Sequence, residues 1–196
     1  VTTPQVLVGD TRIIGTRDAS GTARFLGIPF AEPPVGKARW LRPVPYRFTA
    51  PSLDATQFAP ACMQSGSGLD WYHGMMARVG VDPALMEGPK YSEDCLYLNV
   101  WTDLDDAALA LSDSAHRQQV GQKLDQQPLR PVLIFIHGGS GVGGWCYEPN
   151  YHGGPLARKG VIVVTVAYRL GVFGWMNHPE MATSNLALHD LSLALD

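Results

Sequence analysis

The sequence predicts an α/β fold with a mostly parallel central sheet, and two apolar segments carry most of that prediction. Residues 132–136 and 161–167 are almost entirely apolar, without the alternation of a half-exposed strand, which is typical of strands buried on both faces of a parallel sheet. Between them, residues 154–159 predict a short helix that ends at Gly160. The connection is long enough for a parallel crossover.

Shorter elements precede these two strands. Residues 12–17 and 22–28, separated by Asp18-Ala19-Ser20-Gly21, predict a β-hairpin with a four-residue turn. The proline-rich residues 29–60 predict extended coil, because proline interrupts both helices and sheets. Residues 95–101 predict a further strand.

Three more segments complete the expected elements. Trp71–Val79 predicts one or two helical turns, and residues 102–130, rich in Asp and Ala and then in Gln, predict an exposed insertion. Residues 181–196 predict a helix with Ser184 or Asn185 as its N-terminal cap.

Composition excludes several classes of function. The net charge of −3 and the scattered Lys and Arg residues provide no basic stripe for nucleic acid. No apolar run approaches the roughly 18 residues of a membrane-spanning helix. Charged residues make up 17% of the chain, below the roughly 25% of an average soluble domain. We therefore expect the apolar segments to be covered in part by further strands and helices outside this chain. Because the chain opens with Val1, we expect processing or truncation at its N-terminus.

A glycine-rich turn, His-Gly-Gly-Ser-Gly-Val-Gly-Gly at residues 137–144, follows the apolar run at 132–136 directly. Glycines let the chain leave the strand with unpaired N–H groups, and two such groups can stabilise the negative oxygen of a tetrahedral intermediate. Glycine-rich turns after strands also bind phosphate. The turn alone therefore leaves both interpretations open.

Several other segments place the turn in a wider pattern. They are Phe-Leu-Gly-Ile-Pro-Phe-Ala-Glu-Pro-Pro-Val-Gly at 25–36, Arg39-Trp40, Cys62-Met63-Gln64, Ser-Glu-Asp-Cys-Leu-Tyr-Leu-Asn-Val-Trp at 92–101, and Val-Val-Thr-Val-Ala-Tyr-Arg-Leu-Gly-Val-Phe-Gly at 163–174. In this order, and from about Gly9 to the end, the chain resembles the N-terminal part of the type-B carboxylesterase/cholinesterase family. The resemblance implies the N-terminal part of an α/β-hydrolase fold, with residues 1–196 forming an incomplete carboxylesterase type-B domain.

The nucleophile of such an enzyme is missing from the chain. A nucleophile elbow has glycine two residues before and two residues after the serine, and Ser140, preceded by Gly138 but followed by Val142, comes nearest. In the family the acid and the histidine follow the serine, so we expect all three beyond Asp196. The resemblance implies a carboxylic ester hydrolase as the full-length protein, while this chain alone is expected to be inactive.

The resemblance assigns the main-chain N–H groups of Gly139 and Ser140, beside Gly138, to the oxyanion hole. Ser140 replaces the family's usual third glycine, and it keeps its donor if its φ is negative. Gly141 replaces the aromatic residue that commonly follows, which we expect to open or reshape the acyl pocket. His137 is expected to shape the turn rather than to transfer protons, and neither a metal nor a cofactor is implied.

The three cysteines indicate a compartment. Cys62 and Cys95 lie where the family places its first disulfide, which would close a loop over residues 63–94 and favour the secretory pathway or the extracellular space. Two buried thiols in a cytosolic esterase are the alternative. Cys146 is expected to be a free thiol or to pair outside this chain, since no zinc-binding spacing supports a metal site there.

Two ion pairs carry over from the family as structural contacts. Arg39 is expected to pair with Glu93, and Arg169 with Asp190. Charged residues within apolar, glycine-rich segments need partners, whereas four solvated surface charges would need a less apolar context.

The sequence indicates the class of substrate through one position of the loop. Cholinesterases place a tryptophan ten residues before the second cysteine of the loop, where this chain has Leu85, and Trp71 is out of register. The resemblance therefore favours short-chain or aromatic carboxylic esters over choline esters. A catalytically inactive relative, similar to the neuroligin-type adhesion proteins, is the alternative from another functional class.

Overall fold

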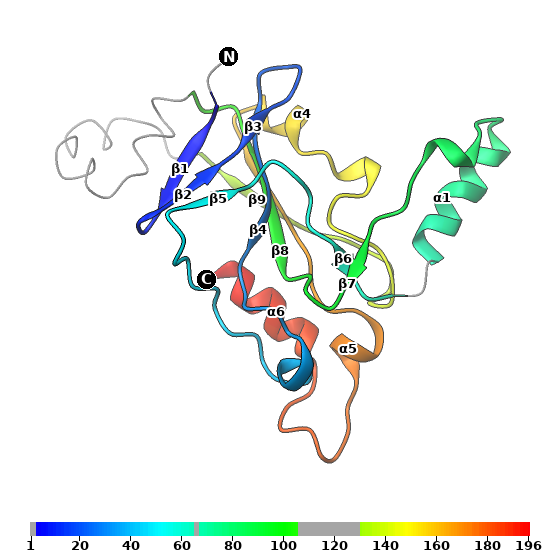
Figure 1. Cartoon of the computed structure of the whole chain (residues 1–196). Coiled ribbons are helices and arrows are strands. Elements are labelled where there is room, and N and C mark those ends of the chain that lie inside the picture. The colour runs from blue at the N-terminus through cyan, green and yellow to red at the C-terminus, as the bar shows by residue number, and fades with distance from the viewer. Residues whose placement is uncertain (1–2, 65–66, 106–129) are drawn as a thin grey trace.

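The computed structural model describes residues 3–64, 67–105 and 130–196. At its centre is a five-stranded sheet in the order β3-β4-β8-β10-β9 (Figure 1). Its strands are β3 (Thr16–Arg17), β4 (Ala23–Pro29), β8 (Tyr97–Thr102), β10 (Ile162–Val166) and β9 (Val132–Ile136). The predicted crossover is confirmed, because β9 and β10 pair in parallel. The pairings that join β3, β4, β8 and β10 are antiparallel.

The two apolar strands differ in burial. Val163 and Val166 of β10 are 3% and 1% exposed, as expected for a strand inside the sheet. In β9, however, Val132 and Ile136 are 55% and 46% exposed, so the prediction of burial on both faces is wrong for β9 in this structure. The physical reason is its position: among the strands that the structure describes, β9 lies at the edge of the sheet and pairs with β10 alone.

The predicted hairpin is divided into two parts. β3 and β4 form the part of the hairpin next to the turn and pair in antiparallel. Within the turn, the Asp18 carboxylate accepts hydrogen bonds from the N–H groups of Ser20 and Thr22. The preceding residues form β2 (Thr11–Ile14) of a second sheet, between β1 (Gln5–Val8) and β5 (Ser52–Asp54). Gly15 lies between the two parts, and a Cβ atom there would lie 2.5 Å from the Arg24 carbonyl oxygen, so the position requires glycine.

The loop over residues 63–94 contains a longer helix than predicted. α1 (Ser67–Arg78) has 12 residues and ends before Gly80, whose φ is +76°. The two ends of the loop meet where β6 (Ala61–Cys62) pairs with β7 (Tyr91–Ser92), and η2 (Pro83–Leu85) follows α1. In Figure 1, α1 stands to one side of the central sheet, beyond β6 and β7. The insertion expected over 102–130 falls mostly, at 106–129, outside the described residues.

The remaining helices are short apart from the last. They are η1 (Gly36–Ala38), η3 (Pro149–Tyr151), α4 (Gly154–Ala157), α5 (Gly171–Trp175) and α6 (Leu186–Leu195). The predicted helix at the end of the chain is confirmed with a later start, and Asn185 takes the N-cap position with a φ of +54° and no side-chain hydrogen bond to the helix. Among the described residues, no helix is long and apolar enough to span a bilayer.

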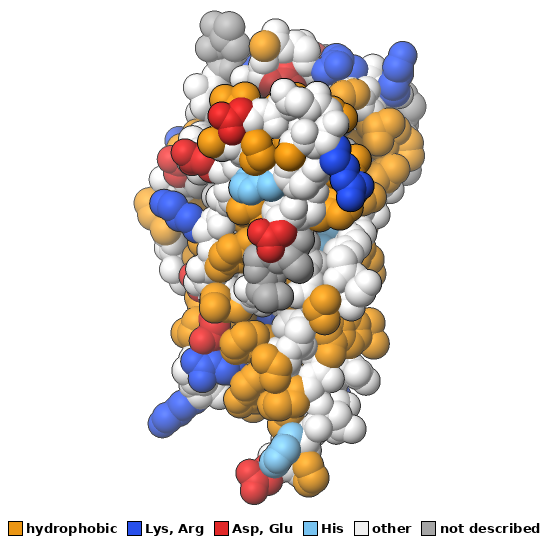
Figure 2. Space-filling view, turned by 90° about the vertical axis from the view of Figure 1, so that its right-hand side faces the viewer, with side chains coloured by type: hydrophobic (Ala, Val, Ile, Leu, Met, Phe, Trp, Pro, Cys, Tyr) orange, Lys and Arg blue, Asp and Glu red, His pale blue; other side chains and the backbone are white. Residues whose placement is uncertain are grey.

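The core joins distant parts of the chain. One buried cluster combines Cys62, Cys95 and Leu96 with Leu170 and with Ala187 of α6. α5 and α6 contact each other and lie next to each other in Figure 1, and Ala187 of α6 belongs to this cluster. Figure 2 shows Lys and Arg side chains scattered among acidic and hydrophobic ones over one face of the molecule.

Candidate functional site

The turn at residues 137–144, which we call the glycine turn, leaves the end of β9 in a conformation that favours glycine. Gly139, Gly141 and Gly144 have φ angles of +108°, +71° and +101°, in or near the left-handed region. Ser140 also lies there, with a φ of +56°. The negative φ expected of a donor at Ser140 is therefore absent, and this backbone costs about 1–2 kcal/mol relative to a right-handed one. The expected condition is corrected here: a positive φ strains a serine but leaves its N–H group in place, because only proline lacks that donor.

His137 anchors the start of the glycine turn. Its side chain is buried, its ring stacks on the ring of Tyr168 with centroids 4.6 Å apart, and its Nδ1 lies 2.8 Å from the carbonyl oxygen of Gly138. The Tyr168 hydroxyl donates a hydrogen bond to the His137 carbonyl at 2.8 Å. Burial lowers the pKa of His137, which favours a neutral ring near pH 7.

Carbonyl oxygens of the glycine turn are held within the protein. The Gly139 carbonyl accepts hydrogen bonds from the N–H groups of Val142 and Gly143, at 3.0 and 3.2 Å. The Gly141 carbonyl accepts from the N–H group of Gly171 at 2.7 Å, which ties the turn to the start of α5. These bonds fix the direction of the peptide groups between them.

The N–H groups of Gly139 and Ser140 have a different environment. Both residues are exposed, and within the described part of the chain neither N–H group donates a hydrogen bond. A side chain at position 139 would collide with the carbonyl of Gly143, so glycine is required there for steric reasons as well as for its φ. Two adjacent main-chain donors are thus presented at the surface of the turn.

Two hollows flank the glycine turn. A cavity of about 300 Å³ lies between the turn and α1, with Trp71, Tyr72 and Tyr151 among its lining residues. On the other side, a more open and largely apolar hollow of about 610 Å³ is lined by Ser140, Val172 and Trp175. Both have room for a small organic molecule beside the exposed donors.

Trp175 modifies the expectation for Gly141. A Cβ atom at position 141 would lie 2.6 Å from the Trp175 indole nitrogen. The indole therefore fills part of the space that an aromatic residue at position 141 would use. This contact was not predicted, since Trp175 lies in α5, a helix that the sequence pattern did not indicate.

A carboxylate beneath the turn was also missed. Glu148 accepts a hydrogen bond from the Tyr72 hydroxyl at 2.8 Å and another from the Trp145 N–H group at 3.2 Å. Burial, together with Glu148, raises the pKa of Tyr72. The hydrogen bond between Tyr72 and Glu148 links α1 to the segment after the glycine turn. The positions of these two residues in the sequence did not predict this contact.

The cysteines divide into a bonded pair and a free thiol. A disulfide joins Cys62 to Cys95, whose Cα atoms are 5.0 Å apart, so the loop between them is closed. Cys146 is buried, and its sulfur accepts a hydrogen bond from the Asn99 side chain at 3.3 Å. Burial raises the pKa of the Cys146 thiol to about 12. No three His, Cys, Asp or Glu side chains of the described ranges gather as metal ligands.

The two expected ion pairs have different environments. The Arg39 guanidinium contacts the Glu93 carboxylate at 2.8 Å, with the two side chains 37% and 25% exposed, and this contact lowers the pKa of Glu93. The Arg169 guanidinium contacts Asp190 at 2.7 Å with both side chains buried, and it also donates to the carbonyls of Arg39 and Leu41.

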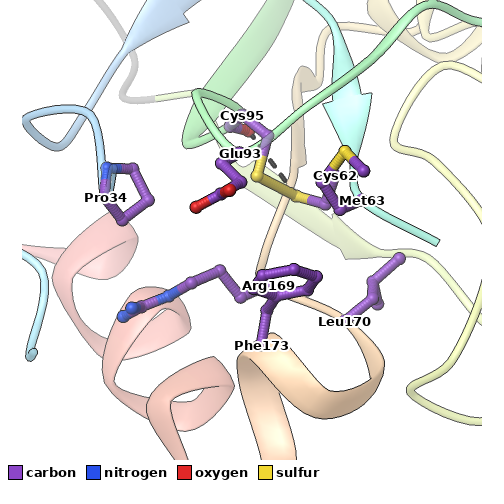
Figure 3. Close-up of a pocket in the computed structure, with 8 residues that line it drawn as sticks. All are labelled: Pro34, Cys62, Met63, Glu93, Cys95, Arg169, Leu170 and Phe173. Atoms are coloured by element: carbon purple, nitrogen blue, oxygen red, sulfur yellow. Dashed lines mark hydrogen bonds between the residues drawn. A yellow bond between two sulfur atoms is a disulfide. The ribbon is translucent and has the colours of Figure 1, made fainter. Parts of the chain in front are cut away.

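The disulfide and the two pairs form one structural region. In Figure 3, Glu93 and Arg169 both line the small gap beside the bond between Cys62 and Cys95. The cavity here is only about 10 Å³, which is about the space of one water molecule. This region supports the fold, whereas the hollows that can admit a ligand adjoin the glycine turn.

Comparison with known proteins identifies the family. The carboxylesterase family model matches residues 2–196. The chain is 38% identical to fumonisin B1 esterase of Sphingopyxis macrogoltabida over 81% of this chain and 23% of that protein. It is 37% identical to acetylcholinesterase-1 of Trittame loki over 87% of this chain and 26% of that protein.

A solved structure gives the fold. A thermophilic PNB esterase superposes with a TM-score of 0.75 at 34% identity, covering 99% of this chain and 34% of that structure. The chain therefore belongs to the carboxylesterase family and has part of an α/β-hydrolase fold. It spans about a quarter of the length of these two curated relatives.

Proposed function

We propose that this chain is the N-terminal part of one carboxylesterase type-B domain, and that the complete domain hydrolyses carboxylic esters with the glycine turn as its oxyanion hole. The observation that carries this proposal is the pair of exposed N–H groups at Gly139 and Ser140, in a turn whose carbonyls are tied back into the protein. Such donors stabilise charge that develops on an oxygen atom during acyl transfer.

The chemistry divides between this chain and the rest of the domain. A serine outside residues 1–196 attacks the ester carbonyl while a histidine takes its proton, and the carbonyl oxygen becomes an oxyanion. The proton passes to the departing alcohol, leaving an acyl-serine that water hydrolyses by the same steps. Gly139 and Ser140 donate to the oxyanion in both halves of the reaction. One such donor contributes roughly 100- to 1,000-fold in turnover.

The substrate class follows from the hollows beside the turn. We infer short-chain or aromatic carboxylic esters, since the cavity near Trp71 and Tyr72 has aromatic walls and the hollow near Trp175 is apolar. Leu85 is 77% exposed in η2 and provides no aromatic face for a choline cation. Choline esters are therefore poor candidates.

Two further features concern the rest of the domain and the location of the protein. Among the described strands β9 pairs with β10 alone, and its exposed apolar side chains fit pairing with further strands of the same domain, which would bury them. The disulfide between Cys62 and Cys95 favours an extracellular location or the secretory pathway over the cytosol.

The proposal is tested by substitutions in the turn of the full-length protein. Gly139→Pro removes one donor and cannot adopt a φ of +108°, so turnover of a p-nitrophenyl ester should fall by at least roughly 100-fold. Ser140→Gly keeps the N–H group and should change turnover only modestly. It should raise the free energy of unfolding by about 1 kcal/mol, because glycine adopts a φ of +56° without strain.

Gly74→Ala, in α1, is the matched control. Gly74 lines neither hollow beside the turn, and an added Cβ there would meet no other atom within 4 Å, so turnover should stay close to that of the unchanged protein. Ser140→Ala separates the backbone from the hydroxyl. Loss of all activity in a folded Ser140→Ala variant would contradict the backbone-donor account and require a role for the hydroxyl.

A further inference from the structure

The Gln64 side chain forms an unusual contact with the backbone of the glycine turn. Its oxygen accepts a hydrogen bond from the Gly144 N–H group at 2.8 Å, and its nitrogen donates to the Gly144 carbonyl at 2.7 Å. The same nitrogen lies 3.1 Å from the Cys62 carbonyl. One half-buried amide thus satisfies both polar backbone groups of one residue in the turn and connects that residue to β6.

Gly144 is a residue through which such a contact can act on the turn. Its φ is +101°, and a Cβ atom there would lie 2.7 Å from the Gly138 carbonyl oxygen and 2.7 Å from the His137 Nδ1. The backbone of Gly144 therefore packs directly behind the start of the turn. A shift of Gly144 would move Gly138 and, with it, the peptide groups that follow.

Gln64 is held on its other side by a closed loop. It lies two residues after Cys62, whose disulfide to Cys95 closes the loop, and the pairing of β6 with β7 supports the same point. The hydrogen bond between Tyr72 and Glu148 forms a second link between this loop and the segment after the turn.

We propose that Gln64 is a positioning residue for the oxyanion hole. It fixes the position of Gly144 relative to the disulfide-closed loop, and Gly144 in turn fixes the donors at Gly139 and Ser140. The inference rests on the proposed function and assigns Gln64 no contact with substrate. Its effect is on turnover, because an oxyanion hole acts on the transition state more than on bound ester.

The chemistry of the amide provides a specific test. An amide offers one donor and one acceptor to Gly144, and so does a protonated carboxyl group, whereas an ionised carboxylate offers acceptors only. Gln64→Glu should therefore retain the contact when the new side chain is protonated and lose the bond to the Gly144 carbonyl when it is ionised. Gln64→Met has a similar length and loses both bonds at every pH.

The experiment measures kcat and KM for a p-nitrophenyl ester with the full-length protein and both variants between pH 5 and pH 8. Taking each variant's kcat relative to the unchanged protein at the same pH removes the titration of the catalytic histidine. We expect both variants to lose roughly ten- to hundredfold in kcat at pH 8, with KM within about twofold. For Gln64→Glu the relative kcat should rise towards 1 as the pH falls, while for Gln64→Met it should stay low.

Hydrogen exchange provides a readout that does not need activity. In Gln64→Met the amides of Val142, Gly143 and Gly144, which donate hydrogen bonds in the unchanged protein, should exchange faster, while those of β10 should not change. If the unchanged protein has no esterase activity, the proposed function fails and exchange alone tests the role of Gln64. A relative kcat close to 1 for Gln64→Met at pH 8, or unchanged exchange in the turn, would overturn the proposal.

Discussion

Arg169 and Asp190 show how a single buried contact can secure the fold around this site. Their side chains are 3% and 0% exposed, and the Asp190 carboxylate also accepts a hydrogen bond from the Arg169 N–H group. Each charge is therefore compensated only by the groups around it. A buried charge that loses its partner is costly, because water cannot replace the lost contact.

We predict that Asp190→Asn destabilises the folded protein by about 3–5 kcal/mol, since it leaves the Arg169 guanidinium buried without its counter-charge. Urea denaturation measures the change. Glu93→Gln, which breaks the more exposed pair with Arg39, is the control and should have a much smaller effect. Comparable losses in both variants would contradict this assignment of roles.

The two ion pairs were predicted from the sequence, whereas other contacts of single residues were not. Arg39, Glu93, Arg169 and Asp190 lie in motifs that resemble those of the family, so the resemblance predicted their pairing. The left-handed backbone of Ser140 was not predicted, because serine rarely adopts a positive φ and only the hydrogen bonds around the turn impose it. Gln64 lies in a quoted motif, yet its contact with Gly144 depends on the closure of the loop.

At the scale of elements, the disulfide-closed loop connects the structural region to the glycine turn. Cys62 and Cys95 begin and end the loop, while α1 lies over the cavity beside the turn. The pairing of β6 with β7 is short, with Ala61 and Cys62 opposite Tyr91 and Ser92. We therefore expect the covalent bond, rather than this pairing, to fix the base of the loop.

We predict that peptide mapping without reductant finds Cys62 linked to Cys95 and Cys146 unlinked. Removing the bond with Cys62→Ser and Cys95→Ser together should lower the free energy of unfolding by roughly 3–4 kcal/mol on the chain-entropy account. Cys146 should resist alkylation at pH 8 until the protein unfolds, because burial raises its pKa to about 12. Recovery of Cys62 and Cys95 as alkylated thiols from folded protein would refute the pairing.

The differences between predicted and observed elements have local causes. α1 extends further towards its N-terminus than expected, because Gly68, despite the low helix propensity of glycine, fits within the helix against Trp145. α5 was missed since two of its five residues are glycines, and Gly174 is required there by its close approach to Arg169. In each case a tertiary contact outweighs the local preference of the chain.

At the scale of the whole molecule, burial follows the position of each strand in the sheet. The apolar pattern of residues 132–136 predicted a strand correctly but not its exposure, which depends on what lies beyond the edge of the sheet. The crossover from β9 to β10 places the glycine turn at the end of a strand, beside the N-terminus of α5. That placement was predictable from the order of elements, whereas the hollows on both sides of the turn depend on packing.

The central claim, that this chain supplies an oxyanion hole to a serine nucleophile in the rest of its domain, is tested most directly by a serine-reactive phosphonate. We predict that the full-length protein hydrolyses a p-nitrophenyl ester, is inactivated by the phosphonate, and carries the label on one serine outside residues 1–196. The chain alone should show neither turnover nor label. A label on Ser140 or another serine of this chain would contradict the account, as would a folded full-length protein with no label and no turnover, the result expected of an adhesion protein.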